Sequence, residues 1–190
     1  LKMTYSNFLI DQKYKLIYTD GHIRQLDMEV SPTYPYNPKH APSSTLHSNA
    51  IDMCRWAIAN LNRGEYQNQR ILKATSYNLL WKPYKDAYDG RKIGLSWFLS
   101  GQNGEMKVQH GGGDLGFSTY FSMKPRKMTA VVVLTNHDYS PVQAISNGIW
   151  ALLEDKEVEM PKIPILIELS KLLVDNNVQM AIERYADLKK

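Results

Sequence analysis

The sequence has only one cysteine and no long apolar run, and both absences narrow what the chain can be. Cys54 cannot form an intramolecular disulfide, and its place in an apolar helical pattern predicts a buried thiol. No apolar stretch approaches the roughly 20 residues that a membrane span requires, and residues 1–4 lack signal-peptide organisation. Because the chain begins with leucine, we expect that it was processed or cut from a longer one. The compartment is therefore unknown, and an export signal and a periplasmic parent protein stay open.

The chain also lacks charge runs of one sign and paired histidines. Its net charge is +4 and its pI about 9.0, but the lysines and arginines are scattered, which argues against nucleic-acid binding. The five histidines show no paired helical or strand spacing, so we predict no metal site and no cofactor. They are His22, His40, His47, His110 and His137. With 43% hydrophobic and 22% charged residues, the 190 residues fit a globular protein with one main core.

The amino-terminal half predicts a hairpin, an extended segment and two helices. Strand-like residues 13–18 and 22–26 flank Asp20-Gly21, a strong turn signal. Four prolines make residues 31–44 an extended surface segment. A helix begins after Asn49, with Asp52 as its capping partner, and ends before Gly64. Its apolar side is expected at Ala50, Cys54, Ala57, Ile58 and Leu61, and Trp56 is expected to pack. Residues 71–81 read as a second helix and 84–90 as a polar loop.

In the carboxy-terminal half, apolar and polar residues alternate with a period of two, which is typical of strands. Strands are predicted over residues 93–99, 106–110, 117–123 and 129–135, and their short connections indicate an antiparallel meander. A helix over 141–155 can cover this sheet with one apolar side, formed by Val142, Ile145, Ile149, Leu152 and Leu153. Two short amphipathic helices follow a linker. We therefore predict an α+β fold in which residues 1–157 form the main body and residues 158–190 a linker and helical appendage.

A glycine-rich run lies between two predicted strands, at residues 110–117. Four glycines among eight residues let the backbone approach a bound group closely, and His110 can titrate near neutral pH. Such a turn can present backbone N–H groups to developing negative charge. It can equally be only a bulged strand end, and on its own the run leaves both interpretations open.

Two familiar motifs match this run but lack their structural context. Gly111, Gly113 and Gly116 satisfy the dinucleotide pattern G-x-G-x-x-G, which must open a helix, whereas residues 117–123 alternate like a strand. His110 with the next three glycines also matches the HGGG element of α/β-hydrolases. That fold requires a parallel sheet and a G-x-S-x-G elbow, and the sequence contains no such elbow.

Residues 109–120, followed by 130–136, strongly resemble the third-motif region of the serine β-lactamase and penicillin-binding-protein superfamily. The resemblance is closest to the class C-like branch of β-lactamases, esterases and D-amino-acid peptidases. Residues 41–56 resemble the segment by which such proteins enter a helix of their helical region. The resemblance covers roughly residues 1–157 and only the carboxy-terminal half of that family's domain. It implies a partial β-lactamase/transpeptidase-like fold, with the carboxy-terminal helical hairpin added.

The resemblance also implies residue roles in acyl transfer. His110 takes the place of a basic or polar side chain, Gly111 and Gly112 the small positions, and the N–H of Gly113 helps form the oxyanion hole. We therefore predict His110 and Gly113 as catalytic, and Gly111, Gly112 and Asp114 as substrate-binding. Histidine in place of lysine offers no fixed positive charge when neutral, so the substrate need not carry a carboxylate. Esters, small peptides and β-lactams all stay open.

The nucleophile of that family is missing from this chain. Its serine lies in S-x-x-K, a pattern absent from these residues. Tyr5-Ser6-Asn7 matches the second motif, Y-x-N, but its surroundings resemble the stretch that follows that motif, so we interpret the match as accidental. We expect a serine hydrolase fragment that is inactive alone, acts on a small molecule or peptide, and needs the missing amino-terminal half. Two alternatives stay open: a non-catalytic module that binds a protein or cell-wall ligand, and a phosphate- or nucleotide-binding domain.

Overall fold

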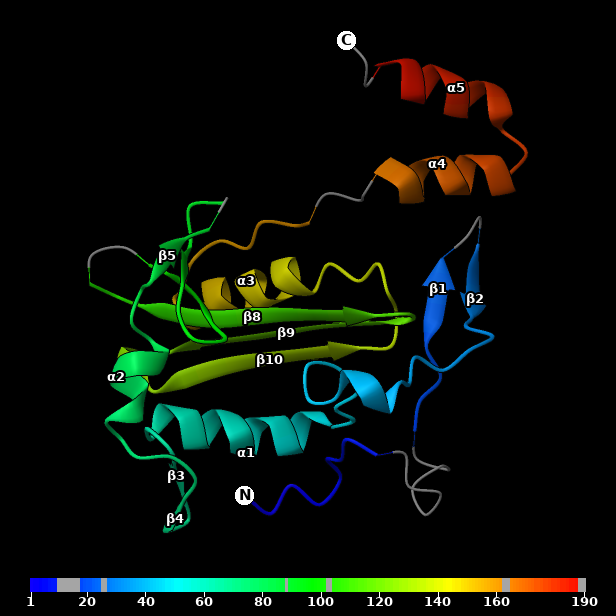
Figure 1. Cartoon of the computed structure of the whole chain (residues 1–190). Coiled ribbons are helices and arrows are strands. Elements are labelled where there is room, and N and C mark those ends of the chain that lie inside the picture. Colours follow the sequence, from blue (N-terminus) through cyan, green and yellow to red (C-terminus); the bar gives the residue numbers. More distant parts are fainter. Residues whose placement is uncertain (10–17, 25–26, 88, 102–103, 162–164, 188–190) are drawn as a thin grey trace.

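The chain folds around one antiparallel sheet with a helix on each face (Figure 1). The computed structural model describes residues 1–9, 18–24, 27–87, 89–101, 104–161 and 165–187. The sheet has the strand order β10-β9-β8-β7-β6-β5, and all neighbours are antiparallel. Its strands are β5 (Lys85–Asp86), β6 (Lys92–Ile93), β7 (Phe98–Ser100), β8 (Lys107–Asp114), β9 (Phe117–Lys124) and β10 (Thr129–Thr135). Spatial order follows sequence order, which confirms the predicted meander and the α+β class.

The other elements surround this sheet. They are β1 (His22–Arg24), β2 (Met28–Val30), η2 (Pro38–His40), α1 (Ala50–Leu61), β3 (Glu65–Tyr66), β4 (Gln69–Arg70), α2 (Ser76–Leu80), η3 (Pro125–Lys127), α3 (Val142–Leu153), α4 (Ile165–Val174) and α5 (Val178–Asp187). Strand β9 begins directly after the glycine-rich turn. No helix starts there, so the context that a dinucleotide motif requires is absent from this hairpin.

The single strand predicted over residues 93–99 is wrong, because the chain turns between β6 and β7. The N–H of Gly94 donates to the carbonyl of Trp97 (2.8 Å) and closes that turn. A Cβ at Gly94 would lie 2.4 Å from the carbonyl oxygen of Leu80, so this close approach requires glycine. The predicted loop over residues 84–90 likewise contains β5, which pairs with β6.

Helix α1 covers one face of the sheet and confirms the predicted cap. The side chain of Asn49 accepts the N–H of Asp52 (2.9 Å). The predicted apolar side is wrong in part, because Ala50, Cys54 and Ile58 are exposed, so the prediction of a buried thiol is wrong too. The reason is packing, because Trp56 contacts the rings of Trp97 and Phe121. The side of the helix that carries Trp56 therefore faces the sheet, and the side that carries Cys54 does not.

The helix predicted over residues 71–81 is shorter, since α2 occupies only its second half. Strands β3 and β4 form a small hairpin before it. The N–H of Ile71 donates to the carbonyl of Gly64 (2.8 Å), which adds to that hairpin. The N–H of Ser76 donates to the carbonyl of Lys73 (2.9 Å), three residues back, and the carbonyl of Leu72 accepts the guanidinium of Arg70 (3.1 Å), so α2 begins only at Ser76.

Only part of the hairpin predicted around Asp20-Gly21 lies within the described residues. Its first strand, residues 13–18, lies outside them apart from Tyr18. Its second strand contains β1, which pairs antiparallel with β2, a partner that the sequence did not predict. Residues 31–44 contain no α-helix or strand, as predicted, but they are extended only in part, because bends at 32–33, the short 3-10 helix η2 and a turn at 41–43 interrupt them.

Helix α3 covers the opposite face of the sheet, but only Val142 and Ile149 of its predicted side pack there. Its buried residues are Ser146 and Trp150. Three apolar residues of the predicted side are exposed instead: Ile145 (39%), Leu152 (66%) and Leu153 (56%). The cause is a buried polar contact, because Ser122 of β9 bonds the hydroxyl of Ser146 (2.9 Å) and accepts the indole N–H of Trp150 (2.8 Å). These bonds fix the rotation of the helix about its axis.

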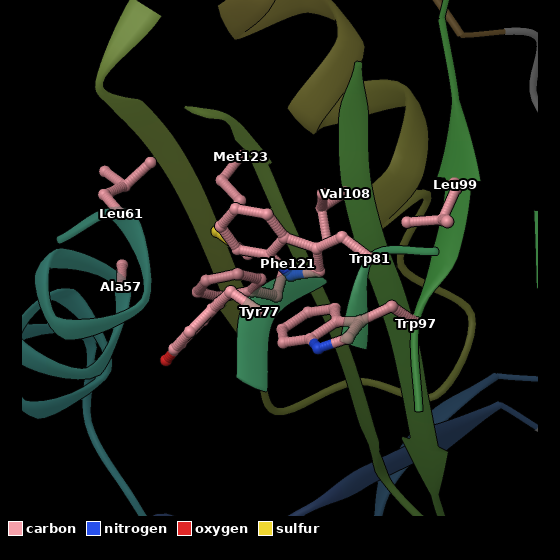
Figure 2. Packing of buried hydrophobic residues seen from close by; sticks show 9 residues of the cluster. All are labelled: Ala57, Leu61, Tyr77, Trp81, Trp97, Leu99, Val108, Phe121 and Met123. Carbon is pink, nitrogen blue, oxygen red and sulfur yellow. The ribbon is translucent and has the colours of Figure 1, made fainter. Parts of the chain in front are cut away.

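Two apolar clusters hold the helices on the sheet. The cluster on the α1 face is shown in Figure 2 and consists of Ala57, Leu61, Tyr77, Trp81, Trp97, Leu99, Val108, Phe121 and Met123. Trp56 stacks on Trp97 (5.4 Å between ring centroids) and meets the edge of Phe121 (5.0 Å), so it is a packing residue as predicted. The cluster on the α3 face consists of Tyr120, Val131, Val133 and Trp150.

The two predicted carboxy-terminal helices are present as α4 and α5. Arg184 of α5 donates to Glu168 of α4 (2.9 Å), and Ala181 is buried. Figure 1 shows the pair standing apart from the sheet, at the end of the segment that follows α3. The division of the chain at residues 157 and 158 stays a prediction. In the described part of the chain, no helix has the length and apolar character needed to cross a membrane.

Candidate functional site

The glycine-rich strand β8 ends in a tight turn that only glycine can complete. Leu115 and Gly116 connect β8 to β9, and Gly116 has a φ of +78°. A Cβ at Gly116 would lie 2.7 Å from the Cα of Gly21, so the segment before β1 packs directly on the turn. The N–H of His22 donates to the carbonyls of Gly116 (3.2 Å) and Asn136 (2.9 Å). The segment at Gly21 and His22 therefore holds the hairpin tip and ties it to Asn136, just after β10.

One edge of β8 is open next to this tip. Strand β7 pairs with β8 only as far as Gln109, so in the described part of the chain the edge from Gly111 to Asp114 has no strand partner on that side. Because Asp114 and Phe117 close the turn, they form a hydrogen-bonded pair, and such pairs alternate along an antiparallel ladder. Asp114 and its even-numbered neighbours thus bond to β9. Gly111 and Gly113 direct their backbone N–H and C=O groups to the open edge.

The three consecutive glycines meet different constraints. A Cβ at Gly112 would lie 2.6 Å from Oγ1 of Thr119, which leaves no room for a side chain. A Cβ at Gly111 would make ordinary contact with the ring of Tyr120, at 3.5 Å. Among the described residues, a Cβ at Gly113 would have only the carbonyl oxygen of Phe117 nearby, at 4.0 Å. Space around Gly113 therefore stays open for another group.

His110 lies exposed beside this edge. Its Nδ1 is 2.6 Å from the carbonyl oxygen of Gly111. Since a carbonyl only accepts, Nδ1 carries the proton of the neutral ring, and Nε2 keeps a lone pair. The imidazole also packs on Phe98 (5.4 Å between centroids), whose ring lies 4.2 Å from the guanidinium of Arg91. In the neutral tautomer with the proton on Nδ1, Nε2 can accept a hydrogen bond.

Asp114 is bonded within the chain. One carboxylate oxygen accepts the hydroxyl of Ser44 (3.0 Å), and the other accepts the N–H of Leu115 (2.9 Å). These bonds fasten the segment before α1 to the hairpin tip. The substrate-binding role predicted for Asp114 stays a prediction, as do the roles of the other predicted site residues.

An aromatic cluster that the sequence did not predict lies beside the tip. His47 has three tyrosine rings around it, those of Tyr18 (5.2 Å), Tyr34 (5.5 Å) and Tyr36 (5.9 Å). Tyr34 also meets Phe117 of β9 edge-on at 5.8 Å. Burial raises the pKa of Tyr34, and Tyr18 nearby adds to the effect. The only signal in the sequence was two tyrosines among the prolines of residues 31–44.

The histidines do not gather into a metal site in the described part of the chain. His22 and His137 are joined by an isolated β-bridge, and His40 lies 3.4 Å from the side chain of Asn37. Among the described residues, no group of three or more His, Cys, Asp or Glu side chains is placed to hold a metal ion.

An antiparallel sheet flanked by two helices, with a glycine-rich strand at an open edge, defines an α+β protein with the core of a β-lactamase/transpeptidase-like fold. The chain belongs to the β-lactamase family, whose model matches residues 4–155. A search of curated proteins gave no match.

Solved structures agree on this fold. The chain is similar to an octameric penicillin-binding protein homologue from Pyrococcus abyssi, with a TM-score of 0.70 and 21% identity over 90% of this chain and 38% of that one. It is also similar to a β-lactamase/D-alanine carboxypeptidase from Pseudomonas syringae, with a TM-score of 0.66 and 17% identity over 82% and 50%. A class C β-lactamase gives a TM-score of 0.63 and 15% identity over 84% and 48%. The chain thus spans at most half the length of these proteins.

Proposed function

We propose that this chain is one part of a serine acyl-transfer hydrolase and supplies the oxyanion side of its site. The observation that carries the proposal is the open edge of β8, to which Gly113 directs its N–H beside the imidazole of His110. The sequence has no S-x-x-K motif, so the nucleophilic serine must come from polypeptide outside this chain.

In the reaction, the serine hydroxyl attacks an amide, lactam or ester carbonyl and gives up its proton to the lysine of its motif. The carbonyl oxygen becomes an oxyanion and accepts the N–H of Gly113. One such donor is worth about 3–4 kcal/mol in the transition state. The leaving group departs with a proton, and a water or an amine then resolves the acyl-enzyme.

His110 sets the polarity of this side of the site. Its lone pair on Nε2 can accept a hydrogen bond from a substrate N–H or hydroxyl, and the neutral ring offers no permanent charge. The site therefore has no built-in requirement for a substrate carboxylate. We propose small esters, small peptides and β-lactams as the substrate classes to test.

The test compares two substitutions at Gly113, assayed in the assembled enzyme. Gly113→Pro removes the N–H, and proline is tolerated where an edge N–H has no strand partner. Gly113→Ala keeps the N–H, and its Cβ would have no neighbour closer than 4.0 Å within the described part of the chain. With the polypeptide encoded before Leu1 present, we expect Gly113→Pro to lower kcat for p-nitrophenyl acetate or nitrocefin by about 100- to 1000-fold, and Gly113→Ala to leave it nearly unchanged.

This chain alone should not turn over either substrate. Clear activity of the isolated chain that a single serine substitution within it abolishes would refute the proposal. Equal kcat values for the two Gly113 variants would refute the role of that N–H. An upstream polypeptide without S-x-x-K would instead favour a non-catalytic binding module.

A further inference from the structure

We infer that Asp114 is a positioning residue, which acts on the substrate through a tyrosine-bearing segment that it holds against the hairpin tip. We call residues 31–47 the strap, and the hydrogen bond from the hydroxyl of Ser44 to the carboxylate of Asp114 (3.0 Å) the latch. This role differs from the direct substrate contact predicted from the sequence. The identity of the bound group rests on the proposed function, whereas the latch can be measured without turnover.

The strap runs from β2 to α1, beside the end of the sheet at which β8 turns into β9 (Figure 1). At its start, the N–H of Ser31 donates to the carbonyl of Gly21 (2.8 Å), the residue that packs on the turn. Further along, the ring of Tyr34 meets the ring of Phe117 edge-on, at 5.8 Å between centroids. The latch adds a bond to β8. The strap is therefore tied to both strands of the hairpin.

Backbone strain lies directly beside the latch. Thr45, the residue after Ser44, has a φ of +69°, which is an outlier for a β-branched residue. Among the described residues, its buried hydroxyl has no hydrogen-bond partner, so its own side chain does not compensate the strain. Such conformations persist only where surrounding contacts impose them, and they cluster at functional sites. Loss of the latch therefore lets this part of the strap relax.

The carboxylate of Asp114 already has a partner within the chain for each of its oxygens. One oxygen accepts the hydroxyl of Ser44, and the other accepts the N–H of Leu115 (2.9 Å). These two bonds direct the carboxylate toward the strap and toward its own turn. The contact with the substrate therefore falls to the groups that the latch positions.

The latch positions an aromatic surface. Tyr34 stacks on the imidazole of His47 with 10° between the ring planes, and Tyr36 lies 5.9 Å from the same imidazole. Tyr34 is 38% exposed and Tyr36 is half-buried, so parts of both rings remain accessible. Aromatic rings bind flat apolar groups by offset stacking and by edge contacts. The strap therefore offers a surface to a flat aromatic part of a substrate.

This surface lies next to the proposed oxyanion donor. Asp114 directly follows Gly113 and lies opposite Phe117, and opposite residues of an antiparallel pair direct their side chains to the same face. Tyr34, which contacts Phe117, therefore lies on the face of the sheet that carries the Asp114 carboxylate. His110 lies at the other end of the glycine run, about 13 Å along the strand from Asp114 at roughly 3.3 Å per residue. A substrate whose carbonyl meets Gly113 can thus reach the strap with its acyl group, and the favoured class is esters and amides with a flat aromatic acyl group.

The first measurement needs only this chain and follows His47 by NMR. Stacking on Tyr34 shifts the imidazole protons upfield, and the N–H of His47 is protected by its bond to the carbonyl of Asn7 (2.9 Å). We expect Ser44→Ala and Asp114→Ala each to lose most of this upfield shift. Both should also speed amide exchange at His47 by about threefold or more.

Two further variants should keep the latch. In Asp114→Asn the side-chain oxygen can accept the N–H of Leu115 while the amide N–H donates to the hydroxyl of Ser44, so the charge is lost and the latch remains. Ser43→Ala is the matched control, because that neighbouring hydroxyl bonds the carbonyl of His40 (2.6 Å) within the strap. Both variants should retain the upfield shift and the protection of His47.

The second measurement compares two esters in the assembled enzyme, with the polypeptide encoded before Leu1 present. The substrates p-nitrophenyl phenylacetate and p-nitrophenyl acetate share a leaving group and differ in the aromatic acyl group. We expect Ser44→Ala to raise KM for the phenylacetate about three- to tenfold, as loss of one charge-assisted hydrogen bond predicts, and KM for the acetate by less than about twofold. Tyr34→Ala should repeat this pattern, and Tyr34→Phe, which keeps the ring, should stay near the wild-type KM. A variant that only destabilised the fold would lower turnover of both esters alike.

Three results would overturn the positioning role. The first is a His47 signal that neither Ser44→Ala nor Asp114→Ala moves. The second is an equal rise in KM for both esters. The third is an Asp114→Asn variant as impaired as Asp114→Ala beside a harmless Ser44→Ala, which would show that Asp114 contacts the substrate through its charge. If the assembled protein turns over neither ester, the proposed function fails, and the His47 signals then decide the latch by themselves.

Discussion

Among the three consecutive glycines of β8, Gly112 is the one at which a side chain should be tolerated least. It lies opposite Thr119 in the β8–β9 ladder, and a Cβ there would be 2.6 Å from Oγ1 of that threonine. Forcing a methyl group into such a contact costs about 1–3 kcal/mol. Gly→Ala at an unhindered position stabilises by about 0.4–1 kcal/mol through the unfolded chain. We therefore expect Gly112→Ala to lower the free energy of unfolding by about 1–2 kcal/mol.

The contact can be isolated by a double-mutant cycle, measured by urea unfolding followed through tryptophan fluorescence. Thr119→Ala removes Oγ1 and keeps the Cβ of residue 119, which would lie 3.9 Å from a Cβ at residue 112. In that background Gly112→Ala should be neutral, or stabilising by up to about 1 kcal/mol. Gly111→Ala and Gly113→Ala serve as controls, because their Cβ atoms meet nothing closer than 3.5 Å and 4.0 Å.

Equal effects at Gly112 and Gly113, or no relief by Thr119→Ala, would refute this reasoning. The consequence would reach beyond stability, because the contact depends on the register that places Gly112 opposite Thr119. A shift by one residue would exchange the backbone groups that face β9 with those that face the open edge. Gly113 could then no longer direct its N–H to the site.

Three further substitutions test the framework. Hydrogen bonds from Lys124, and then from Lys127, hold the pKa of Glu154 in the folded chain well below its usual value near 4.5. The ionised Glu154 carboxylate therefore stabilises the folded state at pH values above its unfolded pKa, and this stabilisation is lost as the pH falls. Glu154→Gln should therefore lower the melting temperature most above about pH 5, and the deficit should shrink on acidification in a calorimetric pH series. Asp52→Ala removes a fully buried carboxylate that accepts bonds from Tyr5, Ser6 and Arg55, and should cost about 3–5 kcal/mol in urea; under about 1 kcal/mol would contradict it. Gly116→Ala should cost about 2–4 kcal/mol by the same assay, since it adds a Cβ at positive φ; a neutral result would contradict the turn geometry.

The elements that the sequence predicted best are those with long, regular patterns. Strands β9 and β10 match the predicted ranges to within one residue, and α1 begins at a side-chain cap visible in the sequence. Strand β8 instead continues through the glycines to Asp114, beyond its predicted end at His110. The errors fall where a local pattern is cut by a contact from elsewhere. Gly94 is the clearest case, because the carbonyl of Leu80 comes too close for any other residue. Neither the periodicity of a segment nor its secondary-structure propensity contains information about a contact between residues that lie far apart in the sequence.

The candidate site also has a part that the sequence could predict and a part that it could not. The glycines and His110 are contiguous in sequence, so a motif could mark them. The bond from Ser44 to Asp114 joins residues 70 apart, and the cluster around His47 gathers rings from several segments. These contacts require the folded chain. Composition could only indicate that tyrosines were present.

The error in α3 differs from the others, because the pattern itself was sound. The stripe of Ile145, Leu152 and Leu153 is a regular apolar side, yet the sheet takes the side of Ser146 and Trp150 instead. A helix with one buried polar side and one exposed apolar side is unstable as an end state, since the apolar side is left in water. The periodicity of α3 therefore identified an apolar side, but it could not show which side the bonds to Ser122 turn toward the sheet.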